Sequence, residues 1–287
     1  MIDRTTEQPF CQTRVSGSTF VNADCFDVFP FIEDKSIDAI ICDLPYGTTA
    51  CKWDSVLPFD KLWNEYERII KPNGAIVLFG SQPFTSALIM SKIDWFKYEL
   101  IWQKSRPSNF SLAKKQPLKY HENILVFYNK QPTYNPIMTK GEKNHRTKIC
   151  RGKNNIIGDD GTGVGWENTS DVKYPKSVIN IKSTDSTKNE HTTQKPLSLM
   201  EYLIKTYTNE GDMVLDNTMG SGTTNLACIK LNRKSIGIEK EKQYYDVAVR
   251  RASEYCHYVI SLGEVGKNKP KILNLKTNNE STRPTSN

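Results

Sequence analysis

Several features are scarce in this chain of 287 residues, and each absence excludes a class of protein. No apolar run approaches the roughly 20 residues that a helix needs to cross a bilayer, so a membrane-spanning protein is not expected. The chain has only 4 histidines, none in a metal-ligand pair, and no metal site is predicted. Its 7 cysteines include no Cys-x-x-Cys pair, which argues for reduced thiols in a cytoplasmic protein.

The start of the chain and its composition bound the remaining classes. Residues 1–12 are polar and carry Asp3 and Glu7, so a secretory signal peptide is not expected. With 37% hydrophobic and 25% charged residues, the composition is that of a globular protein with one large or two modest domains. The net charge of +7 is compatible with a polyanionic partner, but where the charges lie says more than their sum.

Short apolar runs alternate with helical patterns along the chain. Buried strands are predicted at residues 37–42, 75–79 and 213–215, and helices with one apolar face at residues 62–70 and 196–206. This alternation predicts an α/β fold, with a mostly parallel twisted sheet and helices on both faces in a Rossmann-like arrangement. In such sheets, ligands bind beyond the carboxyl ends of the strands.

Changes in composition divide the chain into segments. Apolar periodicity fades near residue 130 and returns near residue 191, while lysine, glycine and asparagine accumulate between them. The predicted segments are a polar N-terminal arm (1–17), a first α/β half (18–130), an irregular insert (131–190), a second α/β half (191–262) and a disordered tail (263–287).

The motif Asp43-Leu44-Pro45-Tyr46 follows the first buried strand. Because Pro45 cannot donate to a strand ladder, the strand must end by Leu44, at the ligand-binding edge. Asp43 and a neighbouring backbone carbonyl can each accept one hydrogen of an exocyclic amino group on a base. Tyr46 offers a stacking face to a base flipped out of a duplex. The plainer interpretation is a turn of the Asp-x-Pro type.

Two basic segments suit contacts with nucleic acid. Residues 104–110 join two predicted strands and carry Lys104 and Arg106 beside an aromatic ring. In the insert, basic residues alternate with asparagine, threonine and glycine: Lys143, Arg146, Lys148 and Arg151. Such side chains can bind phosphates and read base edges, so the insert is predicted to recognise a DNA target. Solvated surface loops are the alternative.

A glycine-rich turn lies between the strand at 213–215 and the next predicted helix. Asp216 precedes Gly220 and Gly222, and Glu239 ends the strand that follows. The glycines allow a ligand to approach the backbone, and a carboxylate such as Glu239 is placed to bind ribose hydroxyls. A P-loop would need a lysine after the last glycine, and a nicotinamide-binding loop would need a third glycine. Both are missing, so neither class is expected.

Together these motifs resemble those of a known family. Residues 43–46 are similar to the Asp-Pro-Pro-Tyr motif of the S-adenosylmethionine-dependent amino-methyltransferases of DNA, with Leu44 in place of the first proline. The glycine turn resembles their methionine-binding block, and residues 191–196 (HTTQKP) resemble their His-Pro-Thr-Gln-Lys-Pro block, with Thr192 departing from proline. The order of the blocks resembles that of the beta-class, circularly permuted members, over roughly residues 19–256.

The resemblance implies S-adenosyl-L-methionine as the methyl donor and duplex DNA as the substrate, and it admits a homodimer and a cognate restriction endonuclease as partners. It makes the first α/β half catalytic and the second cofactor-binding. It assigns catalysis to Asp43, Pro45 and Tyr46. It assigns cofactor binding to Asp24, Lys195, Pro196, Asp216, Thr218, Gly220, Gly222, Thr223 and Glu239. Asp24 matches the family position that binds the cofactor's adenine amino group.

Alternatives within this reading concern the methylated group. Asp43 favours adenine N6, because the cytosine-N4 enzymes of the family more often carry serine there, and cytosine N4 is the alternative. Methylation at cytosine C5 would need a nucleophilic cysteine, usually in a Pro-Cys pair, and no such pair occurs. Methyltransferases that act on a protein glutamine amide have a similar tetrapeptide, but their glycine block lies earlier in the chain. The order of the blocks here therefore argues against that activity. A non-catalytic DNA-binding module, which Leu44 would favour, is the alternative from another class.

Overall fold

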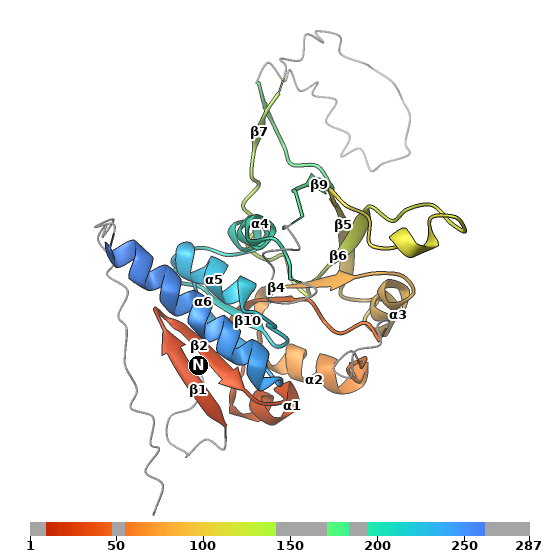
Figure 1. Ribbon diagram of the computed structural model, residues 1–287. Helices are drawn as coiled ribbons and strands as arrows, with labels where there is room; N and C mark the ends of the chain where they lie inside the picture. Colours follow the sequence, from red (N-terminus) through yellow and green to blue (C-terminus); the bar gives the residue numbers. More distant parts are fainter. Residues whose placement is uncertain (1–9, 48–54, 142–170, 184–193, 262–287) are drawn as a thin grey trace, which may run out of the picture. The chain divides into compact units, whose positions relative to one another are not determined.

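The computed structural model describes residues 10–47, 55–141, 171–183 and 194–261, in two units. The larger unit, Met1–Asn135 with Ser177–Asn287, is built on one sheet of order β1-β2-β11-β10-β3-β4-β6-β5-β9 (Figure 1). Its strands are β1 (Cys11–Val15), β2 (Ser18–Asn22), β3 (Ile37–Cys42), β4 (Ile70–Gly80), β5 (Phe96–Gln103), β6 (His121–Phe127), β9 (Val178–Asn180), β10 (Met213–Asp216) and β11 (Lys234–Glu239).

The sheet is mostly parallel, as the sequence predicts. Strands β2, β11, β10, β3 and β4 run in one direction. Strand β6 is antiparallel to both of its neighbours, β4 and β5, while β9 pairs in parallel with β5. The carboxyl ends of β3 and β10 therefore lie side by side, with Leu215 in register with Ile40.

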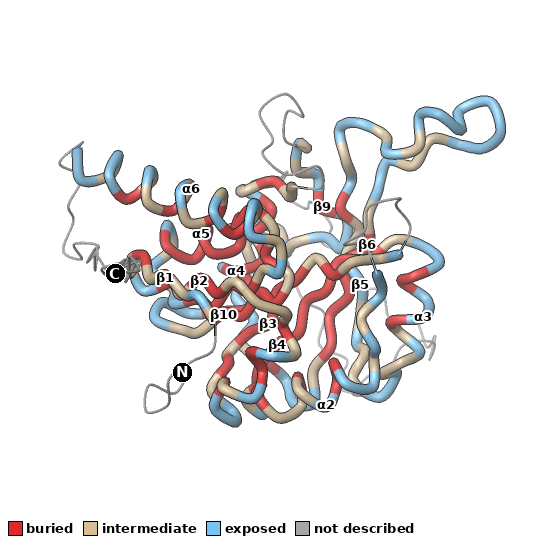
Figure 2. Tube along the Cα trace, turned by 60° about the horizontal axis from the view of Figure 1, so that its bottom comes forward, coloured by how far each residue is buried: buried red, intermediate tan, exposed pale blue. Residues whose placement is uncertain are grey.

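Helices cover both faces because the central strands are apolar on both sides. Along β3, Ile40 and Cys42 pack on the side of α1 (Cys25–Val28), η1 (Phe29–Phe31), α2 (Phe59–Ile69) and α3 (Phe84–Ser91). Ala39 and Ile41 face the opposite side, where α4 (Leu197–Tyr207) and α5 (Thr223–Lys230) pack. The long helix α6 (Lys242–Ser261) packs near β1 and β2. Figure 2 shows β3 and β4 buried along most of their length.

The N-terminal segment differs from the prediction of a polar arm over residues 1–17. Cys11–Val15 form the edge strand β1, paired antiparallel with β2. Ser16 and Gly17, with φ of 46° and 85°, make the two-residue turn between the strands. Edge pairing uses backbone groups and leaves polar side chains in water, so the apolar pattern did not reveal it. The prediction of an arm is wrong from Cys11 onward.

The predicted insert, residues 131–190, contains a separate unit, Pro136–Lys176. Within this unit, β7 (Thr139–Lys140) and β8 (Val172–Lys173) pair antiparallel. The chain rejoins the main sheet as β9, inside the bounds predicted for the insert. The basic residues at 143, 146, 148 and 151, and the predicted tail at 263–287, lie outside the described residues.

Candidate active site

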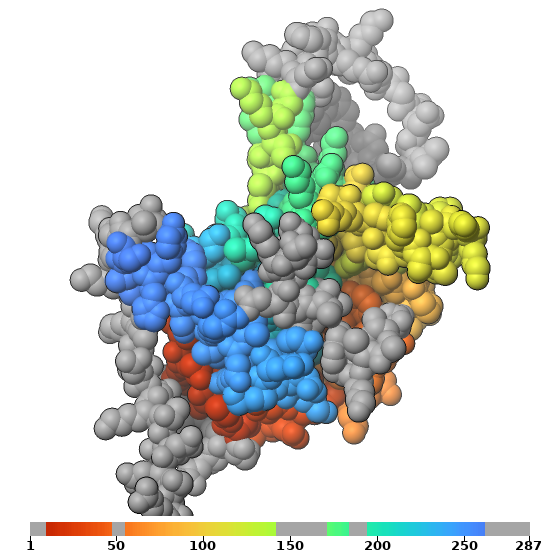
Figure 3. Space-filling model, in the orientation of Figure 1, coloured from red at the N-terminus to blue at the C-terminus, as the bar shows by residue number. Residues whose placement is uncertain are grey.

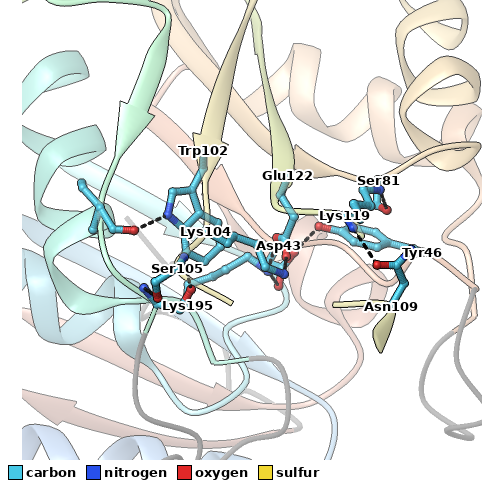
Figure 4. Close-up of polar contacts among 12 residues, drawn as sticks. Asp43, Tyr46, Ser81, Trp102, Lys104, Ser105, Asn109, Lys119, Glu122 and Lys195 are labelled. Carbon is cyan, nitrogen blue, oxygen red and sulfur yellow. Dashed lines mark hydrogen bonds and ion pairs between the residues drawn. The ribbon is translucent and has the colours of Figure 1, made fainter. Parts of the chain in front are cut away.

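Asp43 emerges directly beyond the last residue of β3, as the proline two positions later requires. Its Oδ1 atom accepts a hydrogen bond of 2.6 Å from the Tyr46 hydroxyl, and its Oδ2 atom accepts one from the Lys195 ammonium (Figure 4). Burial raises the pKa of Asp43 above its ordinary value, against the opposing effect of the Lys195 charge. Both carboxylate oxygens thus have a donor, supplied by different segments of the chain.

Lys195 belongs to a chain of alternating charges, which we call the charge chain: Asp43, Lys195, Glu122 and Lys104. Lys195 Nζ lies 3.3 Å from Glu122 Oε2, and Lys104 Nζ lies 2.7 Å from Glu122 Oε1. The side chains of Lys195 and Glu122 are only 10% and 15% exposed. Burial alone would raise the pKa of Glu122, but the two lysine charges lower it to about 2. Glu122 is therefore an anion at neutral pH.

Leu44 and Tyr46 hold the motif against the core. Leu44, the departure from the family's proline, is 3% exposed and belongs to the apolar cluster on the α2 side of the sheet. The Tyr46 ring packs on Phe84, with ring centroids 4.9 Å apart and planes inclined by 31°. A buried leucine can thus anchor the loop that proline would stiffen, and Asp43 and Tyr46 still meet. The role of Pro45 and Tyr46 toward a base stays a prediction.

The glycine turn reaches the same edge of the sheet. The Thr218 hydroxyl donates to the backbone carbonyl of Asp43 at 3.1 Å. The Gly220 N–H donates to Glu239 Oε2 at 2.9 Å, which ties the turn to the end of β11. Gly220 and Gly222 adopt φ of 52° and 74°, and a Cβ atom on Gly222 would lie 2.6 Å from Ala248 Cβ. The turn therefore requires glycine at 222 for both conformation and space.

Asp216 stabilises this turn through hydrogen bonds to residues that follow it in the chain. It is buried, accepts a hydrogen bond from Thr224 Oγ1, and accepts another from the Thr218 N–H at 3.2 Å. Burial raises the pKa of Asp216 to about 7. Carboxylates, a glycine turn and the first N–H groups of α5 are a set that fits the amino-acid end of a ligand such as S-adenosylmethionine, because carboxylates can accept from its ammonium and N–H groups can donate to its carboxylate.

The remaining predicted cofactor residues lie around the two motifs. Asp24 caps α1 by accepting from the Phe26 N–H at 3.0 Å, and its other oxygen lies 3.1 Å from Lys240 Nζ. Pro196 occupies the N-cap position of α4, and Thr223 is the first residue of α5. Their contacts with a cofactor stay predictions.

Two side chains that secure the glycine turn were not among the predicted site residues. Arg251 on α6 donates to the backbone carbonyl of Ser221 and, at 3.0 Å, to the Ser221 hydroxyl. Ser221 Oγ lies 3.0 Å from Gln194 Oε1. Gln194 thus contacts the glycine turn while the next residue, Lys195, contacts Asp43, so the HTTQKP segment joins the two motifs. A helix position such as Arg251 carries no local sequence signal for this contact.

Of the predicted nucleic-acid-binding residues, Lys104 and Arg106 lie in the described part of the chain. The Lys104 ammonium pairs with Glu122, so much of its charge is compensated inside the protein. Arg106 is exposed. Within the described residues, no group of histidine, cysteine, aspartate or glutamate is arranged to hold a metal ion. No helix among those residues is long and apolar enough to cross a membrane.

This fold and site define a class. A mostly parallel α/β sheet brings an Asp-x-Pro-Tyr strand end and a glycine turn together, which is the arrangement of a Rossmann-like amino-methyltransferase. The chain belongs to the DNA methylase family, whose model matches residues 37–250. S-adenosylmethionine is the methyl donor, and the predicted family, fold class and activity on DNA amino groups are confirmed.

Relatives and solved structures agree with this assignment. The chain is 31% identical to the Type II methyltransferase M.HpaI of Haemophilus parainfluenzae, covering 84% of this chain and 76% of the relative. It is 28% identical to M.HinfI of Haemophilus influenzae, over 83% of this chain and 68% of that one. The structure of the M1.HpyAVI–SAM complex aligns with a TM-score of 0.53 and 29% identity, over 80% of this chain and 96% of that one.

A more distant structure shares the fold alone. The cytosine-N4-specific PvuII DNA methyltransferase aligns with a TM-score of 0.60 at 14% identity, over 88% of this chain and 96% of that one. Because this likeness shows the fold alone, it has no bearing on which base this chain methylates. The comparisons establish a DNA amino-methyltransferase without choosing between the bases.

Proposed function

We propose that this protein methylates the N6 amino group of adenine at a specific site in duplex DNA. The observation that carries the proposal is the Asp43 carboxylate, which lies beside Tyr46 and next to the glycine turn through Thr218. An aspartate at this position favours adenine over cytosine. The buried Leu44 supports catalysis over a non-catalytic module, because it preserves the meeting of Asp43 with Tyr46.

The chemistry follows from the weakness of the nucleophile. The lone pair of the adenine amino nitrogen is delocalised into the ring, so the nitrogen must be turned toward a tetrahedral shape before it attacks. Asp43 and a backbone carbonyl of the motif accept the two amino hydrogens and offset the positive charge that develops. S-adenosylmethionine supplies an electrophilic methyl group on a sulfonium. Because burial raises the pKa of Asp43, this carboxylate is suited to take the proton that the methylated nitrogen loses.

A basic loop that projects from the protein favours the proposal that the substrate is DNA. Residues 104–120 connect β5 to β6 next to the charge chain and contain basic residues but no acidic one. The loop stands out from the surface in Figure 3, and Phe110 near its tip is 73% exposed. We assign phosphate contacts to Lys104 and Arg106 in this loop, and target recognition to Lys143, Arg146, Lys148 and Arg151 in the insert.

The proposal also extends to partners and cellular location. The relatives are named as Type II methyltransferases, which belong to restriction–modification systems, so a cognate restriction endonuclease is proposed as a partner in the cell. A homodimer is proposed on the family resemblance, and light scattering of the purified protein measures it. A cytoplasmic location is also proposed, and no helix among the described residues could cross a membrane.

Methyl transfer from labelled S-adenosylmethionine to DNA tests the function directly. DNA from a methylation-free host is incubated with the purified protein, digested to nucleosides and separated. The expected product is N6-methyl-2′-deoxyadenosine; N4-methyl-2′-deoxycytidine would overturn the choice of base. DNA binding without any label on varied sequences would favour the non-catalytic module. Sequencing of DNA from an expressing host, with modified bases identified, gives the target site.

A further inference from the structure

Glu122 is a buried anion that none of the motifs includes. It lies near the start of β6, where the antiparallel register places it opposite Trp102 and next to Asn123, the partner of Gly80 on β4. Its Oε1 atom accepts a hydrogen bond from Lys104 at 2.7 Å. Its Oε2 atom is buried and forms only a longer ion pair, with Lys195 Nζ 3.3 Å away. The Lys195 ammonium is therefore shared between two carboxylates, closely with Asp43 and more loosely with Glu122.

The second observation concerns Asp43. Tyr46 donates to one carboxylate oxygen and Lys195 to the other, so each oxygen already has one donor and room for about one more before any base arrives. An amino hydrogen of the target base needs one of these oxygens. If Lys195 simply withdrew, a buried ammonium would be left without a partner, at a large cost in free energy. The ammonium needs a nearby alternative acceptor, and Glu122 Oε2 is placed to be one.

We propose that Glu122 is a positioning residue that receives the Lys195 ammonium when Asp43 Oδ2 accepts a hydrogen of the target amino group. This inference rests on the proposed function. The movement is short, because Lys195 Nζ already lies between the two carboxylates (Figure 4). Lys104, directly after β5, holds Glu122 in place. The positive charge stays near Asp43 throughout, so Asp43 is kept ionised while its oxygen is released.

The charged and titratable groups around Asp43 fix the expected pH dependence. They come from several elements: Tyr46 on the same loop, Lys195 before α4, Glu122 on β6, Lys104 after β5, Lys119 in the loop before β6, and Asp216 on β10. Lys195 lowers the pKa of Asp43, whereas Glu122 raises it. Removal of the Lys195 charge must therefore raise the pKa of Asp43, and removal of the Glu122 charge must lower it.

The test compares Lys195→Met and Glu122→Gln with the wild type. In the profile of kcat against pH, the acidic limb is the range over which kcat falls as Asp43 is protonated. K195M moves this limb to higher pH by about one pH unit or more. E122Q moves that limb to lower pH and reduces kcat at least about tenfold, because Lys195 now stays on Asp43, while KM for DNA changes little. The matched control is Lys71→Met, which removes a lysine paired with Asp38 at the amino end of β3 and leaves the limb in place.

A second readout does not depend on methyl transfer. In protein labelled with 13C at aspartate carboxyls, the Asp43 signal is identified by its loss in Asp43→Asn and titrated without cofactor. Its midpoint must rise in K195M and fall in E122Q. An unchanged midpoint, or a shift of the same sign in both variants, overturns the proposal, and so does an E122Q enzyme with wild-type kcat. If the midpoints shift as expected in the two variants but the wild-type protein transfers no methyl group, the proposed function is overturned and the charge chain still stands.

Discussion

The Thr218 hydroxyl donates a hydrogen bond of 3.1 Å to the backbone carbonyl oxygen of Asp43. Thr218 belongs to the glycine turn after β10, and Asp43 follows β3, so residues far apart in the sequence meet at one edge of the sheet. The proposed transfer needs this meeting, because the methyl donor and the amino group must share one site. Had the glycine turn lain at another edge of the sheet, the function could not stand.

The Thr218 contact predicts a specific effect. Thr218→Val removes the hydroxyl but keeps the shape, and the loss of a hydrogen bond worth about 1 kcal/mol loosens the Asp43 loop relative to the turn. We expect kcat to fall roughly fivefold, with Thr218→Ser restoring most of the activity. Steady-state methylation of a DNA duplex measures both variants. Equal activity in the valine variant and the wild type would show that the contact does not position Asp43.

Asp43→Ala removes the acceptor of the amino hydrogen. We expect a loss in kcat of at least about a hundredfold, because the charge that develops on nitrogen is no longer offset. Affinity for S-adenosylmethionine and DNA should stay within a few-fold of the wild type, as measured by calorimetry and by fluorescence anisotropy. A variant with near-normal kcat would refute the role assigned to Asp43.

Charge removal in the insert tests the recognition role of that segment. Replacement of Lys143, Arg146 and Lys148 by glutamine should weaken DNA binding and flatten its dependence on salt. If each residue contacts a phosphate, the slope of log K against log salt falls by about 0.9 per residue. The matched control replaces Lys230, which pairs with Glu201 at 2.5 Å. A slope equal to that of the wild type would place the insert away from the DNA.

Asp216 predicts a pH dependence of stability. Burial raises its pKa from 3.8 to about 7, so between these values the folded state holds a proton that the unfolded state has lost. Stability from this group is therefore highest at low pH and declines as pH rises toward about 7, by about 1.4 kcal/mol per pH unit. Urea unfolding of the wild type and Asp216→Asn at several pH values isolates this term. A pH-independent difference between them would contradict the assignment.

Much of the fold could be predicted because its central strands are apolar and its motifs sit at their ends. The strand before Asp43 and the strand before Asp216 are both predicted from short apolar runs, and a parallel sheet then brings their ends to one edge. Their adjacency does not follow from the runs alone. It depends on the pairing of β10 with β3, which the order of motifs indicated only through the family resemblance.

What the sequence could not reveal are contacts made by pairing and by single charges. Strand β1 is held by backbone hydrogen bonds and has few apolar side chains, so it looked like a polar arm. Glu122 belongs to no motif, because a lone glutamate near the start of a strand has no signature in the sequence. Only the antiparallel register of β6 brings it to Lys195, a residue that the resemblance had assigned to the cofactor. Such relationships arise from topology rather than from local pattern.

The strand order has a consequence for how the molecule is made. In the sheet, strands β11 and β10 lie between β2 and β3. Along the chain, however, β10 and β11 come long after β2 and β3. While the ribosome is still adding residues, β3 lacks the neighbour that completes its edge, and non-local pairing of this kind is slow to form. A nascent or truncated chain can therefore carry Asp43 without any place for a methyl donor. Transfer competence should appear only after Glu239 has left the exit tunnel, which ties activity to completed synthesis.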